Sequence, residues 1–368
     1  MHIHELLIYT VKQGASDLHI SSGEIPALRL HGEIQRLNTP AIDSDNCKRL
    51  LYSIMNEKQK RSFEENLEAD FSVGIEGHAR FRVNVFYQTR GIAAVFRVIP
   101  SKVIPLKDLK LPAVINDIAK LRRGLVLVTG PTGSGKSTTL AGILDFINEG
   151  RREHILTIED PVEFVHQPKR CIINQRELGA DTKSFNNALR AALREDPDVI
   201  LVGEMRDLET IQLALTAAET GHLVFGTLHT KGAKDTIDRI IDAFPHAQQE
   251  QVRTMLSGSL QAVISQILLK KANGKGRVCA AEVMLVTYGI RNLIRENKVF
   301  QIPSIMQASK GSGMVLLDDS LRSLAERGVI TREAAMDVSG KNDLFADAEE
   351  TKGTTQSRRS NRGGSSRR

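Results

Sequence analysis

The residues best suited to chemistry form a glycine-rich stretch that ends in lysine and serine. This stretch is Gly130-Pro131-Thr132-Gly133-Ser134-Gly135-Lys136-Ser137, followed by Thr138, and it matches the pattern G-x-x-x-x-G-K-S in full. Its glycines let the backbone wrap an anion with inward-pointing N–H groups. In such a loop Lys136 neutralises the β- and γ-phosphates, and the Ser137 hydroxyl ligates Mg²⁺. The stretch therefore predicts an ATP·Mg²⁺ site at residues 130–138.

Acidic side chains follow two apolar stretches further along the chain. Glu204 ends one of them, Glu159 and Asp160 end the other, and Glu163 comes shortly after. Ligands of open α/β sheets lie at the carboxyl ends of the strands, so we expect these acids beside the phosphates. Glu204 is the first candidate for orienting the attacking water and Glu163 the second. Ser137, Glu159, Asp160 and Glu204 are the candidates for holding Mg²⁺ directly or through water, and solvated salt bridges are the alternative for the acids.

Two histidines bracket a third apolar stretch, residues 223–228. His222 precedes it and His229 follows it. One or both could hydrogen-bond the γ-phosphate, although a lone histidine is more often structural. We therefore keep both as candidate catalytic residues.

Charge and composition narrow the possible functions. The six basic side chains of residues 351–368 account for the whole net charge of +6, so residues 1–350 are neutral overall. Aromatic residues make up only 4% of the chain. Because residues 1–350 carry no net charge and few aromatic side chains are available to stack on bases, specific nucleic-acid binding is disfavoured.

The elements that must position these residues alternate from about residue 113 onward. Apolar strands are predicted at 125–129, 155–158, 199–202 and 223–227, and helices at 137–148, 184–195 and 207–219. Residues 247–272, 288–297, 315–327 and 331–338 are predicted to be mainly helical. Apolar strands interleaved with helices indicate a parallel sheet covered on both faces, an α/β fold.

The N-terminal part has a different pattern. Residues 1–99 are predicted to form a small α+β domain, with helices at 3–13 and 43–67 and strands at 16–21, 27–30, 70–75, 79–87 and 91–99. Residues 100–112 contain three prolines and are predicted to be a stiff linker. The ATPase domain is expected to span residues 113–345, and residues 346–368 to be a disordered basic tail.

Cysteine content and hydropathy point to a cytoplasmic protein. Three cysteines lie far apart, at Cys47, Cys171 and Cys279, which indicates neither a disulfide framework nor a zinc site. No apolar run reaches the ~18 residues of a membrane span, and the N-terminus does not resemble a signal peptide. We expect membrane contact only through a partner.

Several motifs together resemble the secretion-ATPase superfamily and, within it, the PilT-type retraction ATPases of type IV pili. Ala15-Ser16-Asp17-Leu18-His19 resembles the opening signature of this family. Residues 154–166 resemble its acidic box, residues 198–207 its Walker B region and residues 220–230 its histidine box. The resemblance covers about residues 1–345.

The resemblance implies a fold and a mechanism. It implies a PAS-like N-terminal domain, a RecA-like P-loop ATPase core with a C-terminal helical region, and a homohexameric ring. ATP would lie between the two domains, with Arg82 and Arg97 closing over its phosphates. Hydrolysis would reopen the domains about residues 100–112. The implied partner is an inner-membrane pilus platform protein, which places the chain at the inner face of the cytoplasmic membrane.

The C-terminal region separates retraction from assembly ATPases. The four-cysteine motif of the assembly enzymes is absent, whereas Ile290-Arg291-Asn292-Leu293-Ile294-Arg295-Glu296 resembles a segment that the family needs for retraction. The chain departs from the family at Tyr288-Gly289 and at residues 313–318. These departures leave open an accessory ATPase working with a paralogous retraction motor. A DNA-translocating or conjugation ATPase is a further alternative.

Overall fold

The computed structural model describes residues 2–30, 32–75, 79–99, 103–341 and 343–345. The predicted tail at residues 346–368 and the start of the predicted linker, residues 100–102, lie outside this range. The chain divides into two compact units. The first unit contains Met1–Val103, Ile158–Pro168 and Gln175–Phe185, and the second contains Ile104–Thr157, Lys169–Asn174 and the chain from Asn186 onward.

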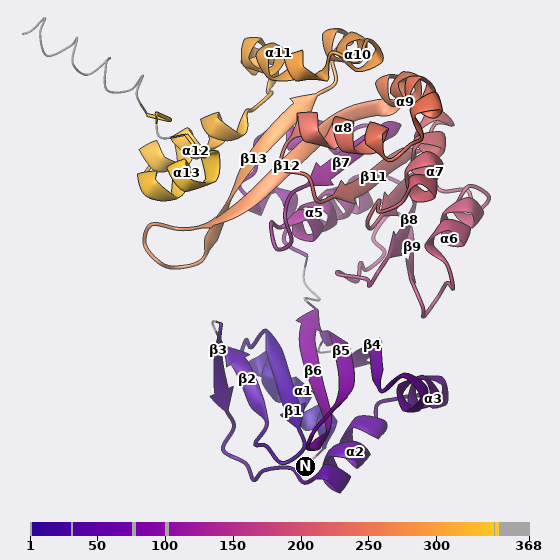
Figure 1. The fold of residues 1–368 in the computed structure, drawn as a ribbon, viewed down its shortest axis with the longest axis vertical. Helices are drawn as coiled ribbons and strands as arrows, with labels where there is room; N and C mark the ends of the chain where they lie inside the picture. Colours follow the sequence, from indigo (N-terminus) through magenta and orange to yellow (C-terminus); the bar gives the residue numbers. More distant parts are fainter. Residues whose placement is uncertain (1, 31, 76–78, 100–102, 342, 346–368) are drawn as a thin grey trace, which may run out of the picture. The chain divides into compact units, whose positions relative to one another are not determined.

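The first unit is built on a six-stranded antiparallel sheet (Figure 1). Its strand order is β3-β2-β1-β6-β5-β4. The bounds are β1 (Asp17–Ser21), β2 (Ala27–Leu30), β3 (Glu33–Arg36), β4 (Glu68–Ile75), β5 (Ala79–Gln88) and β6 (Gly91–Ile99). Helices α1 (Ile3–Lys12), α2 (Ser44–Tyr52) and α3 (Glu57–Asn66) contribute Leu7, Leu51 and Phe63 to a core with Phe81 and Phe96 of the sheet.

The predicted single helix over residues 43–67 is wrong, because the structure has two helices there. A capping box starts the second one: Gln59 N donates to Asn56 Oδ1 at 2.9 Å, and Asn56 N donates to Gln59 Oε1 at 2.8 Å. These reciprocal bonds satisfy backbone groups at the new N-terminus. The spacing of Asn56 and Gln59 is visible in the sequence and could have revealed the break.

The second unit is organised by a seven-stranded sheet in the order β13-β12-β7-β11-β10-β8-β9. The bounds are β7 (Gly124–Thr129), β8 (His154–Glu159), β9 (Ile172–Glu177), β10 (Val199–Val202), β11 (Leu223–Leu228), β12 (Leu260–Lys270) and β13 (Arg277–Leu285). Strands β10, β11, β7 and β12 run parallel to one another. The predicted parallel core is therefore present.

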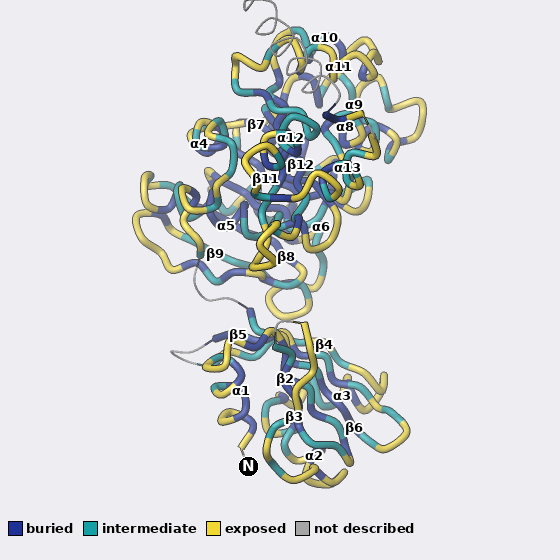
Figure 2. Tube along the Cα trace, turned by 90° about the vertical axis from the view of Figure 1, so that its left-hand side faces the viewer, coloured by how far each residue is buried: buried dark blue, intermediate teal, exposed yellow. Residues whose placement is uncertain are grey.

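Helices cover the strands of this sheet on both sides. Every residue of β7 is buried. Val126 and Val128 pack in one core with Leu140 and Ile143 of α5 (Lys136–Gly150), while α7 (Leu208–Glu219) also packs against β7. Figure 2 shows these buried strands beside exposed loops. Because both faces are covered, the strands are apolar throughout rather than alternating.

The prediction of helix over residues 247–272 is wrong in its second half. Helix α9 (His246–Ser259) ends where β12 begins, and β12 pairs antiparallel with β13 along nine residues from Ala262–Leu285 to Lys270–Arg277. The sheet is therefore mixed. A strand buried on both faces has no alternating pattern and cannot be told from a buried helix by periodicity. Strands β3 and β9 were not predicted either.

The remaining helices lie between and after these strands. They are α4 (Ile115–Ile118), α6 (Phe185–Ala192), α8 (Ala233–Asp242), α10 (Tyr288–Arg295), α11 (Ile302–Ala308), α12 (Leu317–Glu326) and α13 (Arg332–Ser339). Helices α12 and α13 form a small core of their own with Leu269 and Ala280 of the hairpin. Among the described residues, no helix has the length and apolar character needed to cross a bilayer.

Candidate functional site

The glycine-rich stretch forms the turn between β7 and α5. Gly130, Gly133 and Gly135 have φ values of 137°, 77° and 94°, which side chains with a Cβ rarely adopt. A Cβ on Gly130 would also lie 2.2 Å from the Gln266 carbonyl oxygen. Helix α5 begins at Lys136, directly after the turn. The backbone thus has the form of a phosphate-binding loop that leads into a helix N-terminus, an arrangement that favours anion binding.

Lys136 folds back over this loop. Its Nζ donates to the carbonyl oxygens of Gly130 at 2.8 Å and Pro131 at 3.2 Å. Burial lowers the pKa of Lys136, and the Glu204 carboxylate acts on it in the opposite direction. The ammonium group therefore lies within electrostatic reach of Glu204, at the position where phosphate oxygens would replace the two carbonyls.

Glu204 follows β10, and its carboxylate contacts one arginine and one histidine. Its Oε2 lies 2.7 Å from Arg206 Nη2, and its Oε1 lies 3.3 Å from His229 Nε2. The Arg206 hydrogen bond is the largest influence and keeps the pKa of Glu204 below its ordinary value of 4.5, against the effect of burial. The carboxylate is therefore ionised at neutral pH and able to accept a hydrogen bond from water.

The two candidate histidines lie at opposite ends of β11. Leu228 of this strand pairs with Thr129 of β7, so His229 follows at the same edge as Gly130. His222 instead lies at the other end, where Gly124 N donates to its carbonyl oxygen at 2.9 Å and its Nδ1 contacts the Ala217 carbonyl at 2.9 Å. The strand between them is roughly 16 Å long. The structure therefore brings His229, but not His222, to the phosphate loop of this chain.

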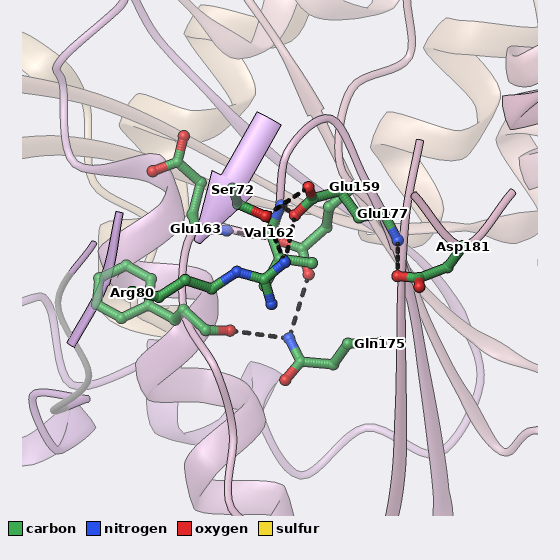
Figure 3. Close-up of polar contacts among 9 residues, drawn as sticks. Ser72, Arg80, Glu159, Val162, Glu163, Gln175, Glu177 and Asp181 are labelled. Carbon is green, nitrogen blue, oxygen red and sulfur yellow. Dashed lines mark hydrogen bonds and ion pairs between the residues drawn. The ribbon is translucent and has the colours of Figure 1, made fainter. Parts of the chain in front are cut away.

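The acidic residues Glu159, Asp160 and Glu163 belong to the first unit, where Glu159 and Glu163 hold a loop together (Figure 3). Glu163 N donates to Glu159 Oε2 at 3.2 Å, and Gln175 Nε2 contacts Glu159 Oε1 at 3.4 Å. Glu159 is 7% exposed, whereas the Glu163 carboxylate points away from the Glu159 side chain. Within the described residues no group of three or more histidine, cysteine or acidic side chains has the arrangement of a metal site. Any Mg²⁺ bound there would need phosphate or water oxygens as further ligands.

A buried carboxylate beside this box escaped the sequence prediction. Glu177 Oε2 accepts hydrogen bonds from Arg80 Nη2 at 3.1 Å and from Val162 N at 3.2 Å, and its Oε1 accepts one from Ser72 Oγ at 2.9 Å. Arg80 also donates to Ser72 Oγ at 2.6 Å, so the four groups form one network (Figure 3). Glu177 ends β9, which was not predicted, and no motif singles it out.

A second residue that the sequence did not reveal supports the phosphate loop from β12. Gln266 is 3% exposed, and its Nε2 donates to Thr139 Oγ1, in the first turns of α5, at 2.9 Å. The same group contacts Cys279 Sγ at 3.3 Å. Gln266 therefore links the β12–β13 hairpin to the helix that starts at Lys136.

Arg82 and Arg97 are cross-strand partners on β5 and β6 of the first unit. Both residues are exposed. Arg97 donates from Nε to Asp17 Oδ1 at 2.8 Å. The pair thus presents positive charge at the surface of its sheet.

Comparison with known proteins decides the family. A model of the family described as Type II/IV secretion system protein matches residues 1–336. The chain belongs to this family. Among members of the Type II/IV secretion system family, it is 58% identical to the type IV pilus retraction ATPase PilT of Pseudomonas aeruginosa, over 91% of this chain and 97% of that protein. It is 39% identical to the type IV pilus ATPase PilU of the same organism, over 94% of this chain and 90% of PilU.

Two solved structures of ATPases resemble this chain along most of its length. The crystal structure of the pilus retraction motor PilT with bound ADP superposes with a TM-score of 0.88 at 51% identity, covering 93% of this chain and 98% of that one. The X-ray structure of the ATPase DotB of Legionella pneumophila superposes with a TM-score of 0.80 at 26% identity, covering 92% of this chain and 96% of DotB. The predicted RecA-like fold and the predicted ATPase class are confirmed.

Proposed function

We propose that this protein is a motor that hydrolyses ATP to power retraction of type IV pili. The observation that carries the proposal is the 58% identity to a retraction ATPase along almost its whole length, in a chain whose phosphate loop, Glu204 and His229 lie at one sheet edge. The motor would act as a homohexamer on an inner-membrane pilus platform protein, at the inner face of the cytoplasmic membrane. Membrane contact would then pass through the partner, and no specific nucleic acid would be needed.

The residues present fit ATP with Mg²⁺. The backbone N–H groups of residues 130–138 would surround the phosphates, and Lys136 would exchange the Gly130 and Pro131 carbonyls for phosphate oxygens. Ser137 and, directly or through water, Glu159, Asp160 and Glu204 would hold Mg²⁺, which neutralises phosphate charge when bound. Ser134 Oγ is buried with no hydrogen-bond partner among the described residues, so the loop retains an unused donor.

Hydrolysis would depend on three further groups of this chain. Ionised Glu204 would orient the attacking water, and Glu163 is the second candidate for this role. His229 would hydrogen-bond the γ-phosphate from the same sheet edge. Arg82 and Arg97 would bind the phosphates as the two units close about residues 100–112, and would release them after phosphate loss.

A genetic test separates this function from others. The gene is deleted in a piliated host that carries it, and the strain is complemented with the wild type or with Lys136→Ala. We expect the deletion strain and the Lys136→Ala strain to lose twitching and to carry surplus surface pili, while the wild type restores both. Restoration of twitching by Lys136→Ala would contradict an ATP-driven retraction role for this site.

A specific observation favours a second candidate, an accessory retraction ATPase. The chain departs from the family pattern at residues 313–318, where Gly313 has a φ of 91° and Val315 bridges to Val283 of β13. The 39% identity to PilU adds to this case, since it shows resemblance to a second pilus ATPase. In this case the deletion strain would keep most of its twitching and would need a paralogous retraction ATPase for it.

A further inference from the structure

Four charged residues form a row across the sheet of the first unit. Arg29 pairs with Asp17, Asp17 with Arg97, and Arg97 with Arg82, each on the neighbouring strand. Directly paired residues of adjacent strands project from the same face of a sheet. One acid therefore lies among three arginines on a single face.

Asp17 differs from the arginines in being buried. The residue is 3% exposed, its Oδ1 accepts from Arg97 Nε at 2.8 Å, and its Oδ2 accepts from Ser16 Oγ at 2.8 Å. Arg29 Nε lies 3.8 Å from Oδ2. Burial alone would raise the pKa of Asp17, but the hydrogen bonds from Arg97 and Ser16 outweigh it and hold the pKa below 3.8. Asp17 is thus a fixed, buried negative charge within the row.

The atom through which Arg97 binds Asp17 determines what the rest of its guanidinium group can do. The bond uses Nε, and the Arg97 side chain is 69% exposed although the Asp17 side chain is only 4% exposed. Nη1 and Nη2 have no hydrogen-bond partner among the residues that the structure describes. These two nitrogens are the fork that binds phosphate oxygens in a bidentate manner.

The buried acid also makes the arginine pair possible. Arg82 and Arg97 are directly opposite each other, and like charges in such positions destabilise a sheet. The Asp17 carboxylate, on the strand next to Arg97, compensates one of the two charges. A buried ion pair is weak support for stability in itself, because desolvation offsets its attraction. Its geometry, which fixes one end of Arg97 and leaves the other end free, is the property that matters here.

We propose that Asp17 is a positioning residue that holds the Arg97 guanidinium outward for a nucleotide phosphate. This inference rests on the proposed role of Arg97 in phosphate binding. It also assigns a role to the Ala15-Ser16-Asp17-Leu18-His19 motif. The roles proposed for the phosphate loop and for the acidic residues do not involve this motif. Ser16 and Arg29 complete the arrangement by holding the second carboxylate oxygen.

The test is a double-mutant cycle on the purified full-length protein. Asp17→Asn should lower kcat/KM for ATP about tenfold, as expected for loss of one charge-assisted contact. Arg97→Ala should lower it further, and the double variant should be no worse than Arg97→Ala. The affinity for ADP, which lacks the γ-phosphate, should change less than about twofold in Asp17→Asn. Glu24→Gln is the matched control, because Glu24 also pairs with two arginines, Arg36 and Arg90, and should stay within about twofold of wild type.

Three outcomes would overturn the inference, and they differ in what they say about the proposed function. If Arg97→Ala impairs hydrolysis but Asp17→Asn does not, or if the two effects multiply, Asp17 does not act through Arg97. If Arg97→Ala itself hydrolyses ATP normally, the arginine contact of the proposed mechanism fails as well. Should Asp17→Asn melt well below the wild type, Ser16→Ala, which removes the second hydrogen bond to the Asp17 carboxylate, takes its place in the cycle, and its effect should likewise vanish in the Arg97→Ala background.

Discussion

Glu204 and His229 are the two single side chains that we propose to act on a triphosphate at this edge of the sheet. The carboxylate lies between Arg206 and His229, and its lowered pKa keeps it ionised across the neutral range. Such a group is a weak base but a good acceptor for orienting a water molecule. His229 follows the neighbouring strand β11 at the same edge of the sheet. From there it could hydrogen-bond a γ-phosphate bound at the loop.

The placement of the two histidines predicts different effects of their removal. His229→Ala should lower kcat for ATP by about tenfold or more, because a hydrogen bond to the reacting phosphate is lost. His222→Ala should change kcat by less than about threefold, because His222 lies at the far end of β11. Phosphate release by the two purified variants provides the measurement. Equal losses would mean that His222 acts at a phosphate supplied by another subunit.

At the level of elements, β12 supports the phosphate loop through Gln266. Gln266→Leu would leave the Thr139 hydroxyl buried without its partner, which costs about 1–3 kcal/mol. We expect kcat/KM for ATP to fall about tenfold. Thr139→Val should have a similar effect, and the double variant should add little.

Gln261 offers the matched control for this prediction. It lies on the same strand, but at the end near Gly124, and accepts from Arg291 at 3.2 Å. Gln261→Leu should leave kcat/KM within about twofold of wild type. A loss as large as that of Gln266→Leu would show that the strand as a whole, rather than the Thr139 contact, supports hydrolysis.

A second element-level link joins the starts of α8 and α12. Glu282 of β13 accepts from Ala233 N at 2.7 Å and from Leu317 N at 3.4 Å. Burial raises the pKa of Glu282 above its ordinary value of 4.5 despite these bonds. Because α8 follows the histidine box and α12 begins within the altered residues 313–318, Glu282 connects the phosphate edge to the C-terminal helices.

This raised pKa predicts a pH-dependent stability. The folded chain binds the Glu282 proton more tightly than the unfolded chain, so the stabilisation from that proton is lost as the pH rises above 4.5. Relative to Glu282→Gln, the wild type should therefore lose melting temperature between pH 4.5 and pH 7. Thermal unfolding of both proteins across this range provides the measurement, with exposed Glu326→Gln as control. A constant difference between wild type and Glu282→Gln would contradict a raised pKa for the half-buried Glu282.

Local motifs explain which elements could be predicted from sequence. The loop at residues 130–138 and the strands before Glu159 and Glu204 carry their signals within a few residues, and the structure has them where expected. Strand β12 could not be distinguished from a helix because both of its faces are buried. The Gln266–Thr139 bond spans 127 residues, and Glu177 lies on an unpredicted strand, so no local pattern reveals either.

At the scale of the whole molecule, the proposed motor uses one chemical event, ATP hydrolysis, to drive a mechanical one, a conformational change. ATP would be bound at the loop between β7 and α5, and its γ-phosphate would hold contacts that vanish after hydrolysis. A conformational change can be driven only by contacts that differ between the two states. In the proposed mechanism, pilus retraction would therefore require both tight ATP binding at Lys136 and cleavage that depends on Glu204.

Parallel measurement of ATP binding and phosphate release tests this claim most directly. Purified wild type, Lys136→Ala, Glu204→Gln and the surface control Lys120→Ala are compared. Lys136→Ala should lose both binding and release, while Glu204→Gln should keep binding and release phosphate about a hundredfold more slowly. Lys120→Ala should match the wild type. Phosphate release at the wild-type rate by Lys136→Ala or Glu204→Gln would contradict the account.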